Sequence, residues 1–264
     1  MIADRTLSLI LPAHNEEENL EIVVRAALAA LPESFVDYEI VIVNDGSRDG
    51  TAAVADRLAE EDHHVRVVHH AQNRGYGAAL QSGFGAGRGE LLMFMDADRQ
   101  FDPRDIARLA PHVQGYDIVA GYRIARNDPA HRKFIGSSFN LVVRILFGIK
   151  VTDIDCGFKI FQADLLRDME LQSPGALINT EIHAKANRRG ASLIEVGVNH
   201  YPRVSGQQSG GSIPVMARAL RELVLLRWRL RSYAPPARHA VAPGSVPALT
   251  ELRSVSAQPG AADK

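Results

Sequence analysis

The sequence predicts an α/β fold built on a mostly parallel sheet with helices on both faces. Short apolar runs typical of buried strands alternate with segments of helical period through the first half of the chain. Polar clusters follow these runs, as expected where strands end at one edge of a sheet. Repeated strand–helix units place successive strands parallel in one sheet, with helices packed on its two faces.

Strands and helices are expected to alternate up to the middle of the chain. The predicted strands are Thr6–Leu11, Tyr38–Val43, Val65–Val68, Leu91–Met95 and Asp117–Ala120. The predicted helices are Glu17–Leu31, Thr51–Glu61, Tyr76–Ala86 and Pro103–Val113. We expect the first of these helices to end near Pro32, and Pro103 to occupy the first turn of the last, where a missing N–H group is tolerated.

The second half of the chain is less regular. Helices are predicted at Ser137–Phe147, Ala163–Met169, Thr180–Arg189 and Ile213–Leu230, and strands at Phe158–Phe161 and Leu193–Val198. The C-terminal helix, 213–230, is amphipathic and rich in arginine. From about Ser232 the chain turns to Pro, Ala, Gly and Ser without periodicity, so we expect one domain at 1–232 and a disordered tail at 233–264.

Composition narrows the class of protein. The 264 residues, 46% of them hydrophobic, suffice for one sizeable core. The net charge of -1 argues against a dedicated nucleic-acid binder, and the single cysteine, Cys156, excludes an intramolecular disulfide. With no signal peptide evident and no apolar run approaching a membrane span, we expect a cytoplasmic or membrane-surface protein.

Asp96 and Asp98 are the most informative pair of residues, because they directly follow the apolar run Leu91–Met95. Alternate residues of an extended chain share a face, so the two carboxylates project together while Ala97 points away. Hard oxygen ligands at the end of a strand suit Mg²⁺ or Mn²⁺ that also holds a diphosphate. A solvated turn is the alternative interpretation of the pair alone.

Further polar clusters end the other predicted strands and favour a ligand site over isolated turns. They lie at residues 12–16, 44–50, 73–77 and 121–123. Each cluster by itself fits ordinary turn chemistry. Together with 96–100 they would meet at the carboxyl edge of the sheet, where doubly wound folds bind their ligands.

These ordered motifs resemble the GT-A fold of family 2 glycosyltransferases. More narrowly, they resemble the dolichyl-phosphate mannose synthase-like enzymes, which load a sugar onto a polyprenyl phosphate. The resemblance covers roughly residues 6–210 and rests on LPAHNEE at 11–17, VNDGS at 43–47, NRGYG at 73–77, DADRQ at 96–100, DIDCGFK at 153–159 and YPR at 201–203. It implies that the domain at 1–232 is catalytic.

The resemblance also implies a role for individual residues. Pro12, Ala13, His14 and Glu16 would line the nucleotide pocket with Asp96, while Val43 and Asp45 would contact the base or ribose. Asp98 and Gln100, assisted by Asp96, would hold Mg²⁺ or Mn²⁺. Arg123, Arg132, Lys133 and Arg203 would gather the phosphate charge of the donor or the lipid acceptor, with Asp98, Arg123 and Arg203 as the catalytic set.

Two departures from the family pattern put parts of this assignment in doubt. His14 stands where many relatives carry a tyrosine, which leaves the stacking partner of the base undefined. The loop Gly206–Gly210 lacks the lysine that relatives usually place after the arginine corresponding to Arg203. The phosphate contacts of that loop therefore stay open.

The acceptor decides what other groups the reaction needs. A divalent ion stabilises the charge of a departing nucleotide diphosphate without proton transfer. A sugar hydroxyl acceptor requires a general base, whereas a lipid monophosphate is already anionic and needs cationic side chains instead. Glu181 is the best spare carboxylate; it would be such a base or a capping acid in the first turn of its helix, and we favour the cap.

A prenyl phosphate acceptor also requires contact with a membrane. Ser137–Ile149 and Ile213–Leu230 are both candidates for contact with a membrane. The latter combines apolar side chains with several arginines, which suits an anionic membrane surface; an ordinary amphipathic helix packed on the domain is the alternative. In many relatives C-terminal transmembrane helices follow the catalytic domain, and we expect none in this sequence. We therefore expect a peripheral enzyme at the inner face of the cytoplasmic membrane, or one that borrows a membrane-embedded partner.

The predicted activity is a metal-dependent, inverting transfer of a hexose from a sugar nucleotide of the GDP-mannose or UDP-glucose type to a polyprenyl phosphate. A non-processive transferase acting on a saccharide hydroxyl is the first alternative; a processive synthase is disfavoured because Val224 stands where those enzymes carry a glutamine. A non-catalytic sugar-nucleotide-binding module is the second. A Rossmann dehydrogenase is a weaker third, since no Gly-x-Gly-x-x-Gly follows the first strand.

Overall fold

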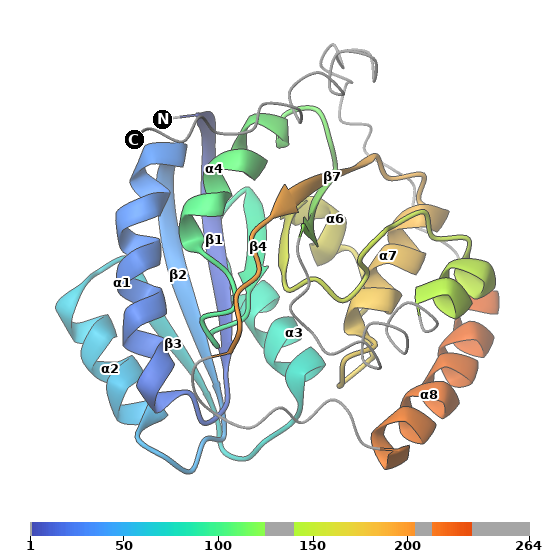
Figure 1. Cartoon of the computed structure of the whole chain (residues 1–264), viewed down its shortest axis with the longest axis horizontal. Coiled ribbons are helices and arrows are strands. Elements are labelled where there is room, and N and C mark those ends of the chain that lie inside the picture. The colour runs from blue at the N-terminus through green and yellow to red at the C-terminus, as the bar shows by residue number, and fades with distance from the viewer. Residues whose placement is uncertain (1, 125–139, 204–212, 234–264) are drawn as a thin grey trace, which may run out of the picture.

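A seven-stranded sheet in the order β3-β2-β1-β4-β6-β5-β7 forms the centre of the protein (Figure 1). The computed structural model describes residues 2–124, 140–203 and 213–233, except for the side chains of 213–221. β6 runs antiparallel to both of its neighbours, while the other neighbouring strands of the described sheet pair in parallel. The predicted fold class, a mostly parallel α/β sheet covered by helices, is confirmed.

The strands follow the apolar runs of the sequence. They are β1 Ala3–Ala13, β2 Phe35–Asp45, β3 Val65–His70, β4 Leu91–Met95, β5 Ile118–Arg123, β6 Phe158–Gln162 and β7 Leu193–Val198. β1 and β2 are longer than predicted, because their first residues pair in the sheet beyond the continuous buried run. Val36 and Asp37 of β2, for example, are exposed and carry no core signal.

The helices are α1 Glu17–Ser34, α2 Thr51–Glu61, α3 Tyr76–Ala86, α4 Ile106–Leu109, α6 Ala163–Arg167, α7 Ile178–Arg188 and α8 Ile213–Arg231. Residues 140–147 are also helical, and this segment is called the 140–147 helix below. The part of the predicted Ser137–Phe147 helix before residue 140 lies outside the described residues, as does the predicted tail from residue 234 onward.

Two predicted helices differ from the structure in their extent. α1 ends near Pro32 as predicted, but it continues past this residue to Ser34; proline removes one backbone donor, yet the N–H of Phe35 still donates to the carbonyl of Leu31. The predicted single helix Pro103–Val113 is instead a short α4 between two 3₁₀ turns, Pro103–Asp105 and Ala110–His112. Pro111 cannot donate to the preceding turn, which limits the α-helical part.

Opposite faces of the sheet bury different sets of helices. On one face, α1, α2 and α4 pack against alternate strand residues such as Leu9 and Met93. On the other face, α3, α6 and α7 pack against the intervening residues, such as Ile10 and Phe94. This alternation is the period of two that a pleated strand imposes, and it holds both helical layers on one rigid sheet (Figure 1).

A third apolar cluster lies beside the sheet, where α8, α7 and the 140–147 helix meet (Figure 1). Leu223, Leu226 and Leu230 of α8 are buried there at helical spacing, together with Val143 of the 140–147 helix. Tyr233 follows α8 and stacks beneath the ammonium of Lys185, so the described fold extends to this residue. The predicted C-terminal amphipathic helix therefore packs on the domain through one of its faces.

Candidate functional site

The parallel strands bring the polar loops to one edge of the sheet. Ala13 at the end of β1 is in register with Asn44 of β2, and Asp45 with His70 of β3. β4 and β5 both run antiparallel to β6, so they point in the same direction as each other. The loops after β1, β2, β3, β4 and β5 consequently share the carboxyl edge, as the sequence predicts.

Asp96 occupies a tight, largely desolvated position just beyond β4. The hydroxyl of Tyr76 donates to Asp96 Oδ1 at 2.9 Å. A Cβ atom at Gly157 would lie 2.2 Å from Asp96 Oδ2, so only glycine leaves room for this carboxylate. Desolvation and the charge of Asp98 raise the pKa of Asp96 to about 7. A cation bound beside Asp96 and Asp98 would stabilise their two negative charges.

Arg203 joins the loops after β1 and β4. Its Nη1 lies 3.6 Å from Asp98 Oδ2, and its Nη2 donates to the carboxylate of Glu16. The Glu16 carboxylate also accepts from Asn19 Nδ2 at 2.6 Å, and burial raises the pKa of Glu16. Residues far apart in the sequence thus converge: two predicted nucleotide or metal ligands meet the predicted phosphate-binding arginine.

Gln100 connects the loop after β4 to the segment that carries Arg203. The N–H of Tyr201 donates to the carbonyl of Gln100 at 2.9 Å, and Gln100 Nε2 donates to the carbonyl of Tyr201 at 3.2 Å. The N–H of Gln100 also donates to Asp98 Oδ1 at 3.1 Å. Arg99 between them has a φ of 64°, a left-handed conformation that reverses the chain and brings Asp98 and Gln100 together.

The first loop is positioned by the end of β2. His14 Nδ1 lies 2.9 Å from the carbonyl oxygen of Asp45, and the N–H of Asn15 donates to Ser47 Oγ at 3.0 Å. Pro12 pairs with Val43 in the sheet. The side chains of Ala13 and Val43 are buried in the core, so these two residues can offer a nucleotide only their backbone atoms.

Asp45 is the organiser of the loop after β3. Its carboxylate accepts hydrogen bonds from His70 Nδ1 at 2.6 Å and from the backbone N–H groups of Arg74 and Gly75, both at 2.9 Å. His70 Nε2 in turn lies 2.8 Å from Ser82 Oγ on α3. Reasoning from the sequence missed His70 and Ser82; the parallel register of β2 and β3 is the signal that would have found His70.

Arg123 forms an ion pair with the carboxylate of Asp153. Its Nε and Nη2 donate to the two carboxylate oxygens of Asp153 at 2.6 and 2.7 Å, and both side chains are largely buried. The two parallel hydrogen bonds hold a permanently charged guanidinium in a fixed position at the carboxyl end of β5. Arg132 and Lys133, the other predicted phosphate-binding residues, lie outside the described residues.

Comparison with known proteins identifies the family. The model of glycosyl transferase family 2 matches residues 8–170. The chain is 34% identical to an undecaprenyl-phosphate mannosyltransferase from Micrococcus luteus, over 77% of this chain and 88% of the relative. This chain belongs to glycosyltransferase family 2. It is a glycosyltransferase, as the sequence predicts.

Two further relatives place this family 2 glycosyltransferase among known proteins. A polyprenol monophosphomannose synthase from Mycolicibacterium smegmatis is 34% identical, over 79% of this chain and 83% of the relative. A solved structure of glucosyl-3-phosphoglycerate synthase from Mycobacterium tuberculosis, in complex with Mn²⁺, uridine diphosphate and phosphoglyceric acid, is 22% identical with a TM-score of 0.67. That likeness covers 84% of this chain and 78% of the other, and it supports the GT-A-like fold.

Lys159 is a buried cation of this glycosyltransferase that the sequence reasoning had not assigned. It lies on β6, donates to the carbonyl oxygen of Ile154 at 2.8 Å and to that of Cys156, and lies over the ring of Phe94. Burial lowers the pKa of its ammonium group. Lys159 therefore connects the loop 153–157 to β6, where it is in register with Phe94 of β4.

Glu181 has a different role from both predicted ones. The residue is 1% exposed, and its carboxylate accepts from the N–H groups of Gln172 and Ser173, at 3.1 and 2.7 Å, and from Lys185 Nζ at 2.7 Å. Glu181 lies in the first turn of α7, as the favoured prediction places it, but its carboxylate accepts from the preceding loop and not from the N–H groups of its own helix. A general base needs a carboxylate within reach of its substrate, and this one is enclosed and fully engaged.

The loop that Glu181 holds packs on the N-terminus of α3. The N–H of Ala78 donates to the carbonyl of Pro174 at 3.1 Å, and Gln81 Nε2 donates to the carbonyl of Ser173 at 2.9 Å. A Cβ atom at Gly77 would lie 2.3 Å from the Ser173 carbonyl oxygen. Glu181 therefore supports, through this loop, the same 73–77 turn that Asp45 organises from the other side.

Proposed function

We propose that this protein transfers a hexose from a nucleotide diphosphate sugar to a polyprenyl phosphate, in a metal-dependent reaction that inverts the anomeric centre. The observation that carries the proposal is the meeting of Asp98, Glu16 and Arg203 beside Asp96, at the carboxyl edge of the sheet. The relatives named for mannosyl transfer to undecaprenyl phosphate and for polyprenol monophosphomannose synthesis support the acceptor class.

Asp96, Asp98 and Gln100 would hold a Mg²⁺ or Mn²⁺ ion. Two carboxylates and an amide oxygen are hard ligands that suit these cations, and the pKa of Asp96 is raised by desolvation and by the neighbouring charge of Asp98. When bound, the ion would stabilise the negative charge that develops on the departing nucleotide diphosphate. The backbone around Pro12 and Val43, together with His14 and Asp45, would receive the nucleotide.

The cationic side chains favour an anionic acceptor. Arg123 and Arg203 are held in place by Asp153 and by Glu16 and Asp98, so they offer fixed charge to phosphate groups. A phosphate monoester attacks without losing a proton, whereas a saccharide hydroxyl requires a base. The enclosure of Glu181 removes the carboxylate that the hydroxyl alternative would have used.

A membrane surface would deliver the lipid. The 140–147 helix exposes Leu141 and Ile145, and α8 exposes Val224 and Trp228, the last by 69%. Arg144 accompanies these apolar side chains on the 140–147 helix, and Arg227 and Arg229 accompany them on α8. Apolar side chains beside cations fit the interface of an anionic leaflet, which we place at the inner face of the cytoplasmic membrane. No helix of the described residues combines the length and apolarity needed to cross a bilayer.

A panel of labelled donors tests the proposal. The full chain is incubated with vesicles containing polyprenyl phosphate, Mg²⁺ or Mn²⁺, and GDP-mannose, UDP-glucose or UDP-N-acetylglucosamine. We expect one donor to transfer label into the lipid phase. Failure of all three donors, from protein shown to be folded, would contradict the proposed substrates. Calorimetry with the same sugar nucleotides and Mn²⁺ then identifies a non-catalytic protein by the absence of binding to every donor.

A further inference from the structure

A turn at the opposite edge of the sheet presents three potential metal ligands. The turn between α2 and β3 consists of Asp62, His63 and His64. Val65, the first residue of β3, is in register with Ile40 of β2, whereas the last residue of β2, Asp45, is in register with His70. This edge carries the amino ends of β2 and β3, whereas the candidate donor site lies beyond their carboxyl ends. No step of the proposed sugar transfer uses these three side chains.

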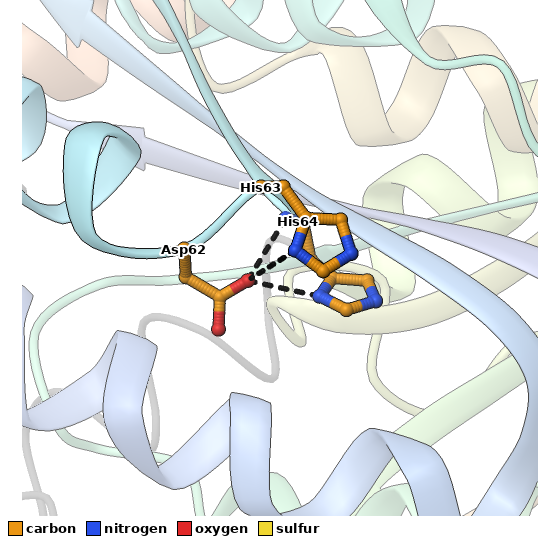
Figure 2. A group of neighbouring side chains, drawn as sticks. All are labelled: Asp62, His63 and His64. Carbon is orange, nitrogen blue, oxygen red and sulfur yellow. Dashed lines mark hydrogen bonds and ion pairs between the residues drawn. The ribbon is translucent and has the colours of Figure 1, made fainter.

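Nitrogen atoms of both histidine rings face one carboxylate oxygen of Asp62, and His64 Nδ1 is hydrogen-bonded to that oxygen (Figure 2). Asp62 Oδ1 lies 2.9 Å from His64 Nδ1 and 3.8 Å from His63 Nδ1. All three ligand atoms lie within 4.8 Å of one another. Each residue contributes through its own side chain, so a cation would close a small chelate formed by three consecutive residues.

These separations match a first-row transition metal. Zn–N bonds of about 2.0–2.1 Å and Zn–O bonds of about 2.0–2.2 Å place neighbouring ligand atoms roughly 3.0 Å apart at right angles and roughly 3.4 Å apart in a tetrahedron. The observed 2.9 and 3.8 Å lie on either side of these values. Binding would require the exposed His63 side chain to rotate away from the ring of His64, with which it makes a tilted contact at a centroid distance of 3.9 Å, and a cation to replace the hydrogen bond between His64 Nδ1 and Asp62.

The backbone of the turn is already fixed in this arrangement. The N–H of Asp62 donates to the carbonyl of Leu58 at 3.1 Å, the N–H of Val65 to the carbonyl of Asp62 at 2.9 Å, and the N–H of Ile40 to the carbonyl of His64 at 2.8 Å. The ring of His64 also stacks on Tyr38, with centroids 4.4 Å apart and planes 10° from parallel. A site with this preorganisation needs little reordering on binding.

The chemistry of the ligands selects the class of cation. The turn offers one carboxylate and two imidazole rings, and the backbone N–H of His64 donates to the carboxylate of Asp62 at 2.9 Å. Imidazole nitrogens suit zinc, nickel and copper, whereas Mg²⁺ prefers a shell of oxygen ligands. The proposed catalytic ion is held by oxygen ligands, so the two ends of the sheet would favour different metals.

We propose that Asp62, His63 and His64 form a second cation site, which binds Zn²⁺ or a similar transition-metal ion with three protein ligands. Water would occupy the remaining coordination positions, since His63 is 87% exposed. The bound ion would fasten the end of α2 to the start of β3. The inference does not depend on the proposed function, because it concerns the opposite edge of the sheet.

Calorimetric titration of the full chain with Zn²⁺ tests the site. The matched control is His69→Ala, since His69 pairs with the single carboxylate of Asp56 at 2.9 Å and has no second imidazole in that pair. We expect His63→Ala to weaken zinc binding by about tenfold or more, and His69→Ala to leave it unchanged. His63→Ala removes an exposed side chain, so a loss of binding in this variant reports on the ligand rather than on the fold.

Two further arms separate this site from the catalytic one. Asp98→Asn is expected to retain the zinc equivalent that His63→Ala loses, and excess Mg²⁺ is expected not to displace it. Equal zinc affinity in the wild-type, His63→Ala and His64→Ala proteins would overturn the proposal. Binding of zinc only at millimolar concentration would do the same, because it would show adventitious surface contact.

Discussion

At the scale of single residues, the site depends on a few carboxylates with unlike surroundings. Asp98 lies beside Arg203, Asp96 lies in a desolvated position, and Glu181 is enclosed by a loop and a lysine. The same functional group is therefore expected to respond to substitution in three different ways. Each response can be measured separately.

Substitution Asp98→Asn tests the proposed metal ligand. The loss of one charged ligand at the point where charge develops is expected to lower kcat by about 10²–10³-fold and to weaken Mn²⁺ binding. Steady-state kinetics across a range of Mn²⁺ concentrations measures both effects. Asp164→Asn is the control, because this side chain is 98% exposed and should leave activity unchanged. Normal kcat and Mn²⁺ dependence in Asp98→Asn would exclude the assignment.

The raised pKa of Asp96 predicts how stability depends on pH without a divalent ion. The folded protein holds this proton more tightly than the unfolded chain, because the pKa rises from 3.8 to about 7. The corresponding stability is complete at low pH and is lost as pH rises through this interval. Urea unfolding of wild type and Asp96→Asn at several pH values isolates the effect. The difference between their free energies of unfolding should change between pH 3.8 and about 7, and Mn²⁺ should make that change smaller. A pH-independent difference would count against it.

Glu181→Gln separates a structural carboxylate from a catalytic base. The substitution removes the charged partner of the buried Lys185 and one carboxylate oxygen that accepts from the N–H groups of the 172–173 loop, so we expect a loss of about 1–3 kcal/mol in the free energy of unfolding. Urea denaturation measures this loss, with the exposed Glu60→Gln as control. The folded variant should retain most of its kcat. A stable variant without turnover would instead restore the hydroxyl-acceptor alternative.

At the scale of elements, periodic segments were the most predictable. The predicted bounds of α2, α3, β4 and β7 agree with the structure, because each combines a clear apolar pattern with turn residues at its ends. The segment 103–113 was less predictable, since Pro111 competes with an otherwise helical pattern. The partners of Glu181 could not be predicted at all, because its helical position does not reveal which loop packs against it.

The exposed faces of the 140–147 helix and α8 make a prediction at this scale. Ile145 and Trp228 are 72% and 69% exposed, so the double substitution Ile145→Ser and Trp228→Ser should not disturb the core. We expect this double substitution to weaken binding to anionic vesicles by about tenfold or more, because the serine variants bury less apolar surface in the membrane interface. Co-sedimentation measures the binding. Ile22→Ser, on the exposed side of α1, is the control, and equal loss in both proteins would contradict the assignment of this surface.

At the scale of the whole molecule, the order of the motifs predicted the common edge but not the contacts across it. Parallel strands made the convergence of the loops after β1 and β4 predictable. Glu16 pairs with Arg203 and Arg123 pairs with Asp153, and the partners in each pair are far apart in the sequence. No local sequence pattern predicts such long-range pairs. Lys159 was missed for a related reason: a lysine in an apolar strand gives no sign of the loop carbonyls that it binds.

The central claim is that the fixed arginines and the carboxylate pair transfer a sugar to a lipid phosphate. The most direct measurement compares polyprenyl phosphate with the corresponding polyprenol as acceptors, using the active donor of the panel, with Mn²⁺ and with a chelator. We predict labelled lipid only from the phosphate and only with the divalent ion, and an anomeric configuration inverted relative to the donor. Equal transfer to the polyprenol, or full activity in the chelator, would contradict the account.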